Sequence, residues 1–449
     1  MAAPDELIKR LYNAFDPFRP LPAGDPAYVD CRAVRGDGEI LIELGREIVL
    51  ADRITHQLYT GHRGAGKSTE LLRLTQYLRG QGFRVVYFAA DEEDIDKEDA
   101  QYTDIRLACT RHLLAELKGG QDNPIWKWLQ LRMQALSELL QSEITLDDIS
   151  VESQIVQFAK LTATLKASPD TRAKIRRMVE PHTVSLIEAL NQFITDAMAK
   201  TPERSTQKLV VIADNLDRIT PIAQTGSSPS NHDTIFIDRS EQLQALKCHV
   251  IYTVPISLVY SSRATDLRDI YDTEAQVLPM VMVRQLSGEI YPPGLAALKE
   301  VISKRVYASA KADISAALVG GVFDTEETLN QLCLMSGGHV RNLMLLTKEE
   351  VKRNEVLPIS ERAVRRAITE ARNTYRNTIT SESQWSLLAQ VHQKKDILDE
   401  AAYRELLFNR CILEYRYIND RGEVCRWRDV HPLIRGIQQF QDALAALST

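Results

Sequence analysis

A nine-residue segment, GHRGAGKST at residues 61–69, constrains the fold of this 449-residue chain more than any other feature. It follows the β-type run His56–Thr60 and precedes a helical run at residues 70–78, which is the spacing and context of a phosphate-binding loop. Its glycines let backbone N–H groups turn toward phosphate oxygens, and the helix that follows points its positive end at them. The sequence therefore predicts an α/β domain that binds a nucleotide.

The residues of this loop divide between phosphate contact and metal binding. Lys67 is expected to neutralise charge on the β- and γ-phosphates, and Ser68 to hold Mg²⁺ through its hydroxyl. The residues expected to contact ATP are Gly61, His62, Arg63, Gly64, Ala65, Gly66, Lys67, Ser68 and Thr69. ATP and Mg²⁺ are thus the predicted cofactors.

A second signal is the run LVVIADNLDR at residues 209–218. Its apolar residues predict a buried strand, so that Asp214 would emerge at the carboxyl end, where parallel sheets bind ligands. We assign Asp214 to the metal, directly or through water. Because Asn215 and not glutamate follows it, Asp217 is the better candidate for polarising the attacking water.

The β-type runs alternate with helical segments. The five runs are His56–Thr60, Arg84–Ala90, Leu209–Ala213, His249–Val254 and Val277–Val283. Such alternation predicts a five-stranded parallel sheet with helices on both faces. Pro279 places the fifth run at the sheet edge, because proline cannot donate to a central ladder.

We expect four parts along the chain. Residues 1–38, rich in proline and glycine, would form an extended arm over the nucleotide site, and residues 39–290 the ATPase core. Amphipathic segments predict a helical insertion at about residues 97–205. A helical lid would occupy residues 291–355. Helices followed by a strand–turn–strand pattern predict a winged helix-turn-helix at residues 356–449.

Several of these segments resemble the AAA+ ATPases and their signal-transducing branch, called STAND. The run at 209–218 looks like the Walker B motif, and His249–Pro255 is similar to the sensor 1 strand. The segment SGGHVRNL at 336–343 looks like the sensor 2 region of origin-recognition-type members. The resemblance implies that Thr253 lies between loop and carboxylate, that Arg341 reaches over the γ-phosphate, and that Tyr28 of the arm covers adenine.

Two departures from that family limit what carries over. Asn215 follows the Walker B acid, which implies slow hydrolysis. STAND proteins typically carry a fused effector and a repeat sensor, and this chain has neither, so we expect a separate effector or sensor protein as partner. Self-assembly into a homo-oligomer is also expected. Arg263 or Arg268 is placed to act as an arginine finger on a neighbouring subunit, or is a plain surface arginine.

The distribution of charge indicates whether the chain binds DNA and whether it has a second metal site. Basic and acidic residues nearly balance in the expected winged helix, which gives no electrostatic footprint for DNA. Arginines 416, 421, 426 and 428 on the hairpin are the best case for DNA contact, and packing or partner binding is the alternative. The acidic run Asp91–Asp99 is expected to be a solvated loop rather than a second metal site.

Composition excludes several classes of protein. The chain is 44% hydrophobic and 26% charged with a net charge of −6, which is typical of a globular protein. Its apolar runs fall well short of the roughly 18 residues of a membrane span, so we expect no membrane contact. Six cysteines without a CxxC pair fit reduced thiols in the cytoplasm.

These observations predict an ATP-binding and ATP-hydrolysing switch of AAA+/STAND type that controls assembly and partner engagement. By analogy it could be the ATPase component of a bacterial antiphage defence system. Two alternatives stay open. One is a DNA-binding loader or regulator of origin-recognition or transposition type, and the other is a nucleotide-locked scaffold with little hydrolysis.

Overall fold

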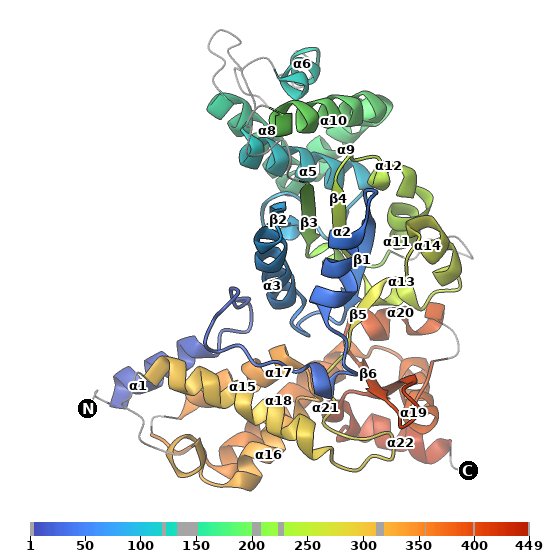
Figure 1. The fold of residues 1–449 in the computed structure, drawn as a ribbon. Coiled ribbons are helices and arrows are strands. Elements are labelled where there is room, and N and C mark those ends of the chain that lie inside the picture. The colour runs from blue at the N-terminus through green and yellow to red at the C-terminus, as the bar shows by residue number, and fades with distance from the viewer. Residues whose placement is uncertain are drawn as a thin grey trace. The chain divides into compact units, whose positions relative to one another are not determined.

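The computed structural model describes residues 4–118, 123–132, 151–199, 208–222, 229–310, 318–354, 356–397 and 400–447 (Figure 1). It divides the chain into two compact units. Unit 1 comprises Met1–Ile40, Gly61–Arg73 and Val277–Thr449, and unit 2 comprises Leu41–Thr60 and Leu74–Gln276. The phosphate-binding loop therefore belongs to unit 1, and the segment with Asp214 belongs to unit 2.

The predicted five-stranded sheet is confirmed. Its strands are β1 (His56–Gly61), β2 (Arg84–Ala89), β3 (Leu209–Asp214), β4 (His249–Val254) and β5 (Gln276–Leu278). Their order is β2-β3-β4-β1-β5, and the pairs β1–β4, β2–β3 and β3–β4 are parallel. Every residue of β3 and β4 is buried, as the apolar runs predict for strands inside a sheet.

The fifth strand lies at the edge, as Pro279 predicts, but it is shorter than expected. It spans Gln276–Leu278 and not Val277–Val283. The backbone N–H groups beyond the proline donate elsewhere within unit 1. Met280 donates to the carbonyl of Glu414 at 3.0 Å, and Met282 donates to that of Val34 at 2.9 Å. An apolar run without free donors cannot continue the ladder.

Unit 2 contains helices between the second and third strands. They are α4 (Ala90–Glu93), α5 (Tyr102–Leu117), α6 (Pro124–Gln130), α8 (Val151–Ala167), α9 (Pro169–Val179), η3 (Glu180–His182) and α10 (Thr183–Ala199). Helix α5 packs on β2, and α8, α9 and α10 pack on α5 (Figure 1). The described part of the predicted insertion is therefore mainly helical. Its expected end near residue 205 lies outside the described residues.

The remaining elements of unit 2 are short. They are η2 (Leu41–Arg46), α2 (Glu47–Leu50), η4 (Leu216–Arg218), α11 (Asn231–Asp233), η5 (Thr234–Asp238), α12 (Ser240–Gln244), α13 (Ile256–Val259) and α14 (Ala264–Tyr271). Helix α3 (Lys67–Gly80) follows the phosphate-binding loop, and its first residues belong to unit 1.

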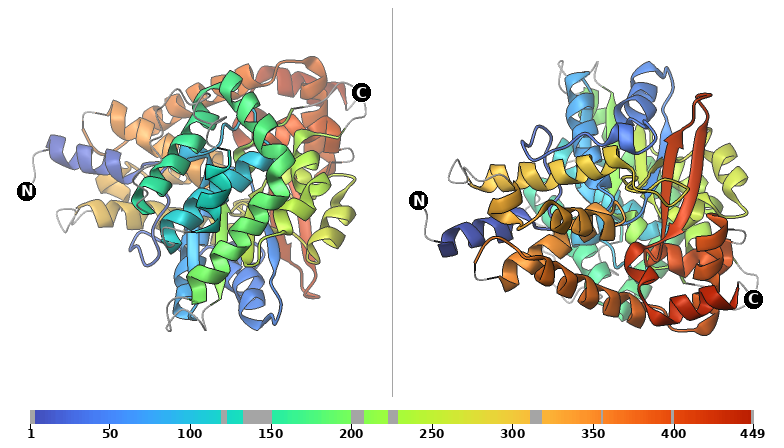
Figure 2. Two further views of the ribbon diagram at one scale, coloured as in Figure 1. Left: turned by 90° about the horizontal axis from the view of Figure 1, so that it is seen from above. Right: turned by 90° about the horizontal axis from the view of Figure 1, so that it is seen from below.

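Unit 1 holds the lid helices and the C-terminal hairpin. Its elements are α1 (Pro4–Ala14), η1 (Arg32–Val34), α15 (Pro292–Ala310), η6 (Leu318–Val322), α16 (Glu326–Met335), α17 (Val340–Arg353), α18 (Glu361–Thr378), α19 (Glu382–Lys394), α20 (Glu400–Phe408), β6 (Ile412–Ile418), β7 (Val424–Val430), α21 (Pro432–Arg435) and α22 (Gln438–Ala446). The right-hand view of Figure 2 shows β6 and β7 as a long antiparallel ribbon. Three helices followed by a hairpin match the predicted winged-helix pattern.

The N-terminal arm is not extended throughout, contrary to expectation. Residues Pro4–Ala14 form helix α1, which packs on α15 and α17. Leu11 and Phe15 are fully buried. Their spacing of four residues places both on one side of a helix, and that apolar side gives the helix its stability. The proline-rich composition of the whole segment concealed this short amphipathic run.

The backbone passes very close to itself at Gly338, ahead of α17. A Cβ atom there would lie 1.7 Å from the carbonyl oxygen of Val281, at a φ of +76°. Gly288, in the same unit, has a φ of +92° and nothing within 4 Å of its would-be Cβ. The two glycines share a left-handed backbone and differ in the space around them.

We therefore expect Gly338→Ala to destabilise the protein more than Gly288→Ala. The left-handed conformation alone costs about 1–2 kcal/mol in an alanine, and overpacking against backbone adds about 1–3 kcal/mol or more. Urea unfolding of both variants measures the difference. Equal losses of unfolding free energy would show that the segment before α17 can move away from Val281.

Candidate functional site

The phosphate-binding loop lies between β1 and α3 and turns on three glycines. Their φ angles are +146° at Gly61, +89° at Gly64 and +116° at Gly66, a range that residues other than glycine rarely adopt. The ammonium of Lys67 donates to the carbonyls of Gly61 at 2.7 Å and of His62 at 3.1 Å. This buried lysine therefore lies within the turn, where an anion would meet its charge.

The loop also contacts the N-terminal arm. The hydroxyl of Thr69, in the first turn of α3, accepts a hydrogen bond from the Leu21 N–H at 3.1 Å. The guanidinium of Arg35 donates to the carbonyl of Ala65 at 2.9 Å. Ser68 lies at the amino end of α3 and is half-buried. The end of this helix presents its N–H groups and its positive dipole.

Lid helix α17 begins against the same loop. His339 is its N-cap: Nδ1 accepts from the Asn342 N–H at 2.9 Å, so Nε2 carries the hydrogen and donates to the Arg63 carbonyl at 2.7 Å. The Arg341 N–H donates to the carbonyl of Gly64 at 3.1 Å. Burial holds the pKa of His339 well below its usual range, so it stays neutral in this role.

Gly64 is also sterically required here. A Cβ at this position would lie 2.6 Å from the Cβ of Arg341 and 2.7 Å from the His339 ring. The Arg341 side chain extends to the arm, where Nε donates to the Pro17 carbonyl at 3.2 Å and the guanidinium lies 5.4 Å from the centre of the Phe18 ring. Arg341 thus lies beside the loop, and its contact with a γ-phosphate stays a prediction.

The winged helix contacts the loop as well, which sequence reasoning missed. His62 Nε2 accepts a hydrogen bond from the Glu414 N–H of β6 at 3.1 Å. The Arg63 guanidinium lies 4.0 Å from the centre of the Phe408 ring of α20 and donates to the Phe408 carbonyl at 3.3 Å. Only backbone contacts with phosphate were expected of residues 62 and 63. Their side chains instead connect the loop to the C-terminal domain.

Tyr28 lies against the start of α3. Its hydroxyl donates to Glu70 at 3.3 Å, and the Arg73 guanidinium lies 4.5 Å from the centre of its ring. Arg73 also pairs with Glu70 at 2.5 Å. Burial raises the pKa of the Tyr28 hydroxyl, which therefore remains a donor. A role in covering adenine stays a prediction for this residue.

Asp214 ends strand β3 in unit 2 and is fully buried. Its two carboxylate oxygens accept different hydrogen bonds. Oδ1 accepts from the Asn215 N–H at 2.7 Å, and Oδ2 accepts from the Tyr87 hydroxyl of β2 at 2.8 Å. These donors fix the orientation of the carboxylate at the carboxyl end of the sheet.

Thr253 and Asp217 lie at the same end of unit 2. The Thr253 hydroxyl on β4 accepts from the Leu216 N–H at 3.0 Å and donates to the Ala213 carbonyl at 3.5 Å. It therefore holds the turn that follows β3. Asp217 lies in that turn, within η4, and is only 4% exposed. The structure thus brings three of the predicted residues, Asp214, Asp217 and Thr253, into one region of unit 2.

A further acid joins this region. Asp91, just beyond β2, accepts from the Asn215 side-chain amide at 2.7 Å and from the Arg218 guanidinium at 2.8 Å. Burial lowers the pKa of Arg218, but the charges of Asp91 and Asp217 and the hydrogen bond to Asp91 outweigh that effect and raise it. Sequence reasoning gave Asp91 no part in the site, because its partners lie more than a hundred residues away.

The acidic run Asp91–Asp99 is not the solvated loop that we expected. Asp94 is 1% exposed and pairs with Arg111 at 2.7 Å and His112 at 2.8 Å. Arg172 and Arg176 of α9 pair with Asp96 at 2.8 Å and Asp99 at 2.9 Å. Cations of the helical insertion therefore neutralise this run. Across the described residues, no group of three or more His, Cys, Asp and Glu side chains forms a metal site.

The candidate arginine fingers have carboxylate partners in their own chain. Arg263 pairs with Asp238 at 2.9 Å and Asp266 at 3.3 Å, and Arg268 pairs with the adjacent Asp269 at 3.2 Å. Arg268 is the more exposed side chain, at 53% against 33%. Both stay predictions as fingers, and Arg268 has the looser contacts.

The four hairpin arginines are not equally available to a partner. Arg428 is buried and pairs with Asp396 and Glu414, and Arg416 pairs with Glu414 at 3.3 Å. Arg421 and Arg426 are exposed. Half of the expected basic surface is therefore used inside unit 1.

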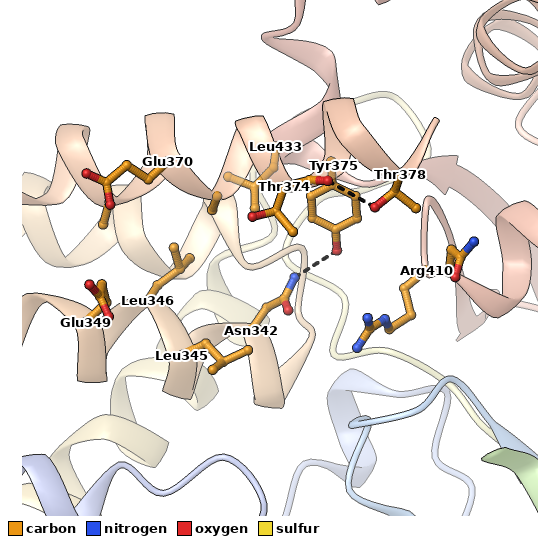
Figure 3. Close-up of a pocket in the computed structure, with 13 residues that line it drawn as sticks. Asn342, Leu345, Leu346, Glu349, Glu370, Thr374, Tyr375, Thr378, Arg410 and Leu433 are labelled. Atoms are coloured by element: carbon orange, nitrogen blue, oxygen red, sulfur yellow. Dashed lines mark hydrogen bonds between the residues drawn. The ribbon is translucent and has the colours of Figure 1, made fainter. Parts of the chain in front are cut away.

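Figure 3 shows a cavity of about 360 Å³ in unit 1, between helices α17 and α18. The Asn342 amide, one residue beyond Arg341, donates to the Tyr375 hydroxyl at 3.1 Å beside it. Arg410 lies near one end, and Glu349 and Glu370 lie near the other. No pattern in the sequence predicts this cavity.

Within the described ranges, none of the helices combines the length and the hydropathy that crossing a lipid bilayer requires.

Comparison with known proteins gives structural likeness only. No protein-family model matches the sequence, and no curated protein matches it. The ORC2 protein of Aeropyrum pernix, in ADPNP–ADP complexes, is 13% identical with a TM-score of 0.42, over 97% of this chain and 98% of that chain. Cdc6p of Pyrobaculum aerophilum is 11% identical with a TM-score of 0.39, over 97% and 98%. The ORC1 protein of Aeropyrum pernix, in complex with DNA, is 12% identical with a TM-score of 0.35, over 93% and 96%. Likeness at this level assigns no activity to this chain.

The contact between His62 and the hairpin predicts a pH effect. Burial, and then the charge of Lys67, lowers the pKa of His62 to about 3, against about 6.5 in an unfolded chain. Between these values the unfolded chain binds a proton that the folded chain does not, so stability falls as the pH falls below about 6.5.

We expect His62→Gln to reduce this acid sensitivity, because an amide oxygen can accept from Glu414 but does not titrate. The wild type should lose about 1 kcal/mol more unfolding free energy than the variant between pH 7 and pH 5.5. Urea titrations at the two pH values give the comparison. Parallel losses in the two proteins would mean that His62 can be protonated without breaking its contact.

Proposed function

We propose that this chain is an ATP-binding and ATP-hydrolysing switch of AAA+/STAND type. The phosphate-binding loop supports nucleotide binding, because its glycines turn the backbone around the ammonium of Lys67 at the amino end of α3. In this proposal Lys67 binds the β- and γ-phosphates, and loop residues Gly61–Thr69 supply N–H donors. ATP is the nucleotide that we propose, with adenine covered by Tyr28.

The residues present fit Mg²⁺. This ion takes oxygen ligands and usually retains several waters, so one carboxylate and one hydroxyl suffice on the protein side. Asp214 and Ser68 would supply them. Asp214 ends strand β3 with its carboxylate oriented by Asn215 and Tyr87, and carboxylate oxygen is a ligand that Mg²⁺ prefers. When bound, Mg²⁺ stabilises negative charge on the phosphates.

For hydrolysis we propose Asp217 as the residue that orients the attacking water. It shares a three-residue turn with Arg218 and is mostly shielded from solvent. Thr253 keeps that turn in place through its bond to Leu216. Arg341, on the lid, would bind the γ-phosphate. With Asn215 in the position after Asp214, turnover is expected to be slow.

The observation that carries the switch is the way the loop is held in unit 1. Three of its consecutive residues, 62–64, contact the C-terminal half of the chain: His62 contacts β6, Arg63 contacts α20 and His339, and Gly64 contacts Arg341. Phosphates bound to the loop would act on the same backbone. Nucleotide state and the arrangement of lid and winged helix are thereby coupled.

Through this coupling, nucleotide binding would change how the winged helix binds a partner. The winged helix would act mainly as a partner surface, since Arg416 and Arg428 already pair with carboxylates within unit 1. Arg421 and Arg426 remain exposed for a partner, a separate effector or sensor protein. Self-assembly through Arg263 or Arg268 belongs to the same proposal.

Lys67→Ala should abolish ATP binding and leave the fold largely intact, because the ammonium is the cation placed at the phosphates. Lys352→Ala, an exposed lysine at the end of α17, is the matched control and should bind ATP as the wild type does. Isothermal titration with ATP and Mg²⁺ measures both. Unchanged affinity in Lys67→Ala would refute the proposed nucleotide site.

Phe408→Ala should weaken the coupling between loop and winged helix. A cation–π contact contributes about 0.5–2 kcal/mol, so its loss should raise the rate of ADP release by about 3-fold or more. Tyr307→Ala removes an exposed aromatic ring of α15 and serves as control. Displacement of a fluorescent ADP analogue gives the rate. A rate that does not change in Phe408→Ala would argue against control of the loop through α20.

A further inference from the structure

Asp91 is the meeting point of three segments in unit 2. Its carboxylate accepts from Asn215 Nδ2 at 2.7 Å and from Arg218 Nη1 at 2.8 Å, both in the turn after β3. Its backbone carbonyl accepts from Lys166 Nζ of helix α8 at 2.7 Å. Lys166 also donates to the carbonyl of Glu92. Asp91 therefore contacts both the turn after β3 and helix α8 of the insertion.

We propose that Asp91 is a positioning residue for ATP hydrolysis, holding the turn that follows Asp214 and contains Asp217. This inference rests on the proposed function, because it concerns the rate at which the proposed site turns over ATP. It adds a residue that the family resemblance and the sequence pattern did not assign. It also gives the helical insertion a part in the reaction, through Lys166.

The first reason is the backbone of Asn215. Its φ is +66°, a left-handed conformation that asparagine tolerates better than most residues. Its N–H donates to Oδ1 of Asp214, so the orientation of this peptide fixes the orientation of the carboxylate. The hydrogen bond from the Asn215 side chain to Asp91 anchors that peptide from the opposite end of the residue. Without the anchor, the turn can relax to a less strained conformation and carry the Asp214 carboxylate with it.

The second reason is the charge of Arg218. Among the carboxylates, Asp91 attracts the guanidinium most strongly, followed by Asp217 and Asp214. While Asp91 pairs with it, Arg218 does not need Asp217 as its principal partner. Removal of Asp91 leaves a half-buried cation without its ion-pair partner, and a salt bridge to Asp217, the adjacent residue, becomes its best alternative. An Asp217 paired in this way would be a poor acceptor for the proton of an attacking water.

The third reason is the rigidity of the support. Lys166 reaches Asp91 from helix α8, and α8 packs on α5 and α9. Helix α9 in turn pairs with Asp96 and Asp99, in the same acidic segment as Asp91. The backbone of this segment is thus held along its length by cations of the insertion. Through its hydrogen bonds with Asn215 and Arg218, Asp91 connects this rigid segment to the turn after β3.

The test is a set of variants assayed for steady-state ATP turnover and for ATP affinity. We expect Asp91→Ala to lower kcat by about tenfold with the Kd for ATP changed by less than about twofold. Asp91→Asn keeps the shape and loses the charge. It should show a similar loss of kcat, and it covers the case in which the alanine variant does not fold. Glu116→Ala breaks another ion pair of unit 2, with Arg84, and should leave kcat unchanged.

A second substitution separates positioning from a general loss of stability. If the liberated Arg218 captures Asp217, then Arg218→Met in the Asp91→Ala background should restore kcat by several-fold. A purely structural defect would worsen with the second substitution. Lys166→Met should lower kcat in the same direction as Asp91→Ala, but less.

Wild-type turnover in both Asp91→Ala and Asp91→Asn would overturn the inference, and so would a double variant less active than Asp91→Ala. Failure of the proposed function has a different signature. In that case Lys67→Ala would bind ATP normally, or Asp214→Asn would turn over ATP at the wild-type rate. Loss of turnover in Asp214→Asn together with normal turnover in Asp91→Ala refutes the positioning role alone.

Discussion

The backbone of the phosphate-binding loop is the constraint on which unit 1 depends. Its turn exposes carbonyl groups, because the glycines direct the N–H groups to one side. His339 and Arg341 satisfy the carbonyls of Arg63 and Gly64, and Lys67 satisfies two more. Gly64 has no room for a side chain because these lid residues lie directly against it. The loop and the start of α17 are therefore packed directly against each other, so a movement of either requires the other to move.

A comparable arrangement organises the turn after β3 in unit 2. There the donors are Asn215, Tyr87 and Leu216, and the acceptors are Asp214 and Thr253. Both segments use hydrogen bonds from neighbouring elements to hold a backbone that is not regular secondary structure. Hydrogen bonds of this kind are buried, and removal of one partner leaves the other unsatisfied at a cost of about 1–3 kcal/mol. Substitution of one of these residues therefore costs stability as well as the orientation of the loop or of the Asp214 carboxylate.

The sequence predicted the parts of this protein that local pattern determines. Apolar runs identified β1 to β4, and Pro279 placed β5 at the edge. The roles of Lys67, Ser68 and Asp214 come from motif spacing and stay predictions. Local pattern could not show which distant residues neutralise Asp94 or contact Asp91. It could not show that β6 and α20 reach His62 and Arg63, because those partners lie about 350 residues away along the chain. Composition does not reveal helix α1, because the helix is much shorter than the proline-rich segment that contains it.

Ion pairs set the register in which the helical insertion packs. Buried ion pairs add little net stability over an apolar packing of the same size, but an unmatched buried charge is strongly unfavourable. The carboxylates at residues 94, 96, 99 and 104 must therefore meet arginines 111, 172 and 176 in one register, since a shifted α9 would bury charges without partners. An apolar interface could slide by a turn at smaller cost. The charges thus specify where α9 lies. Helix α8 packs on α9, and Lys166 of α8 reaches the backbone of Asp91 and Glu92.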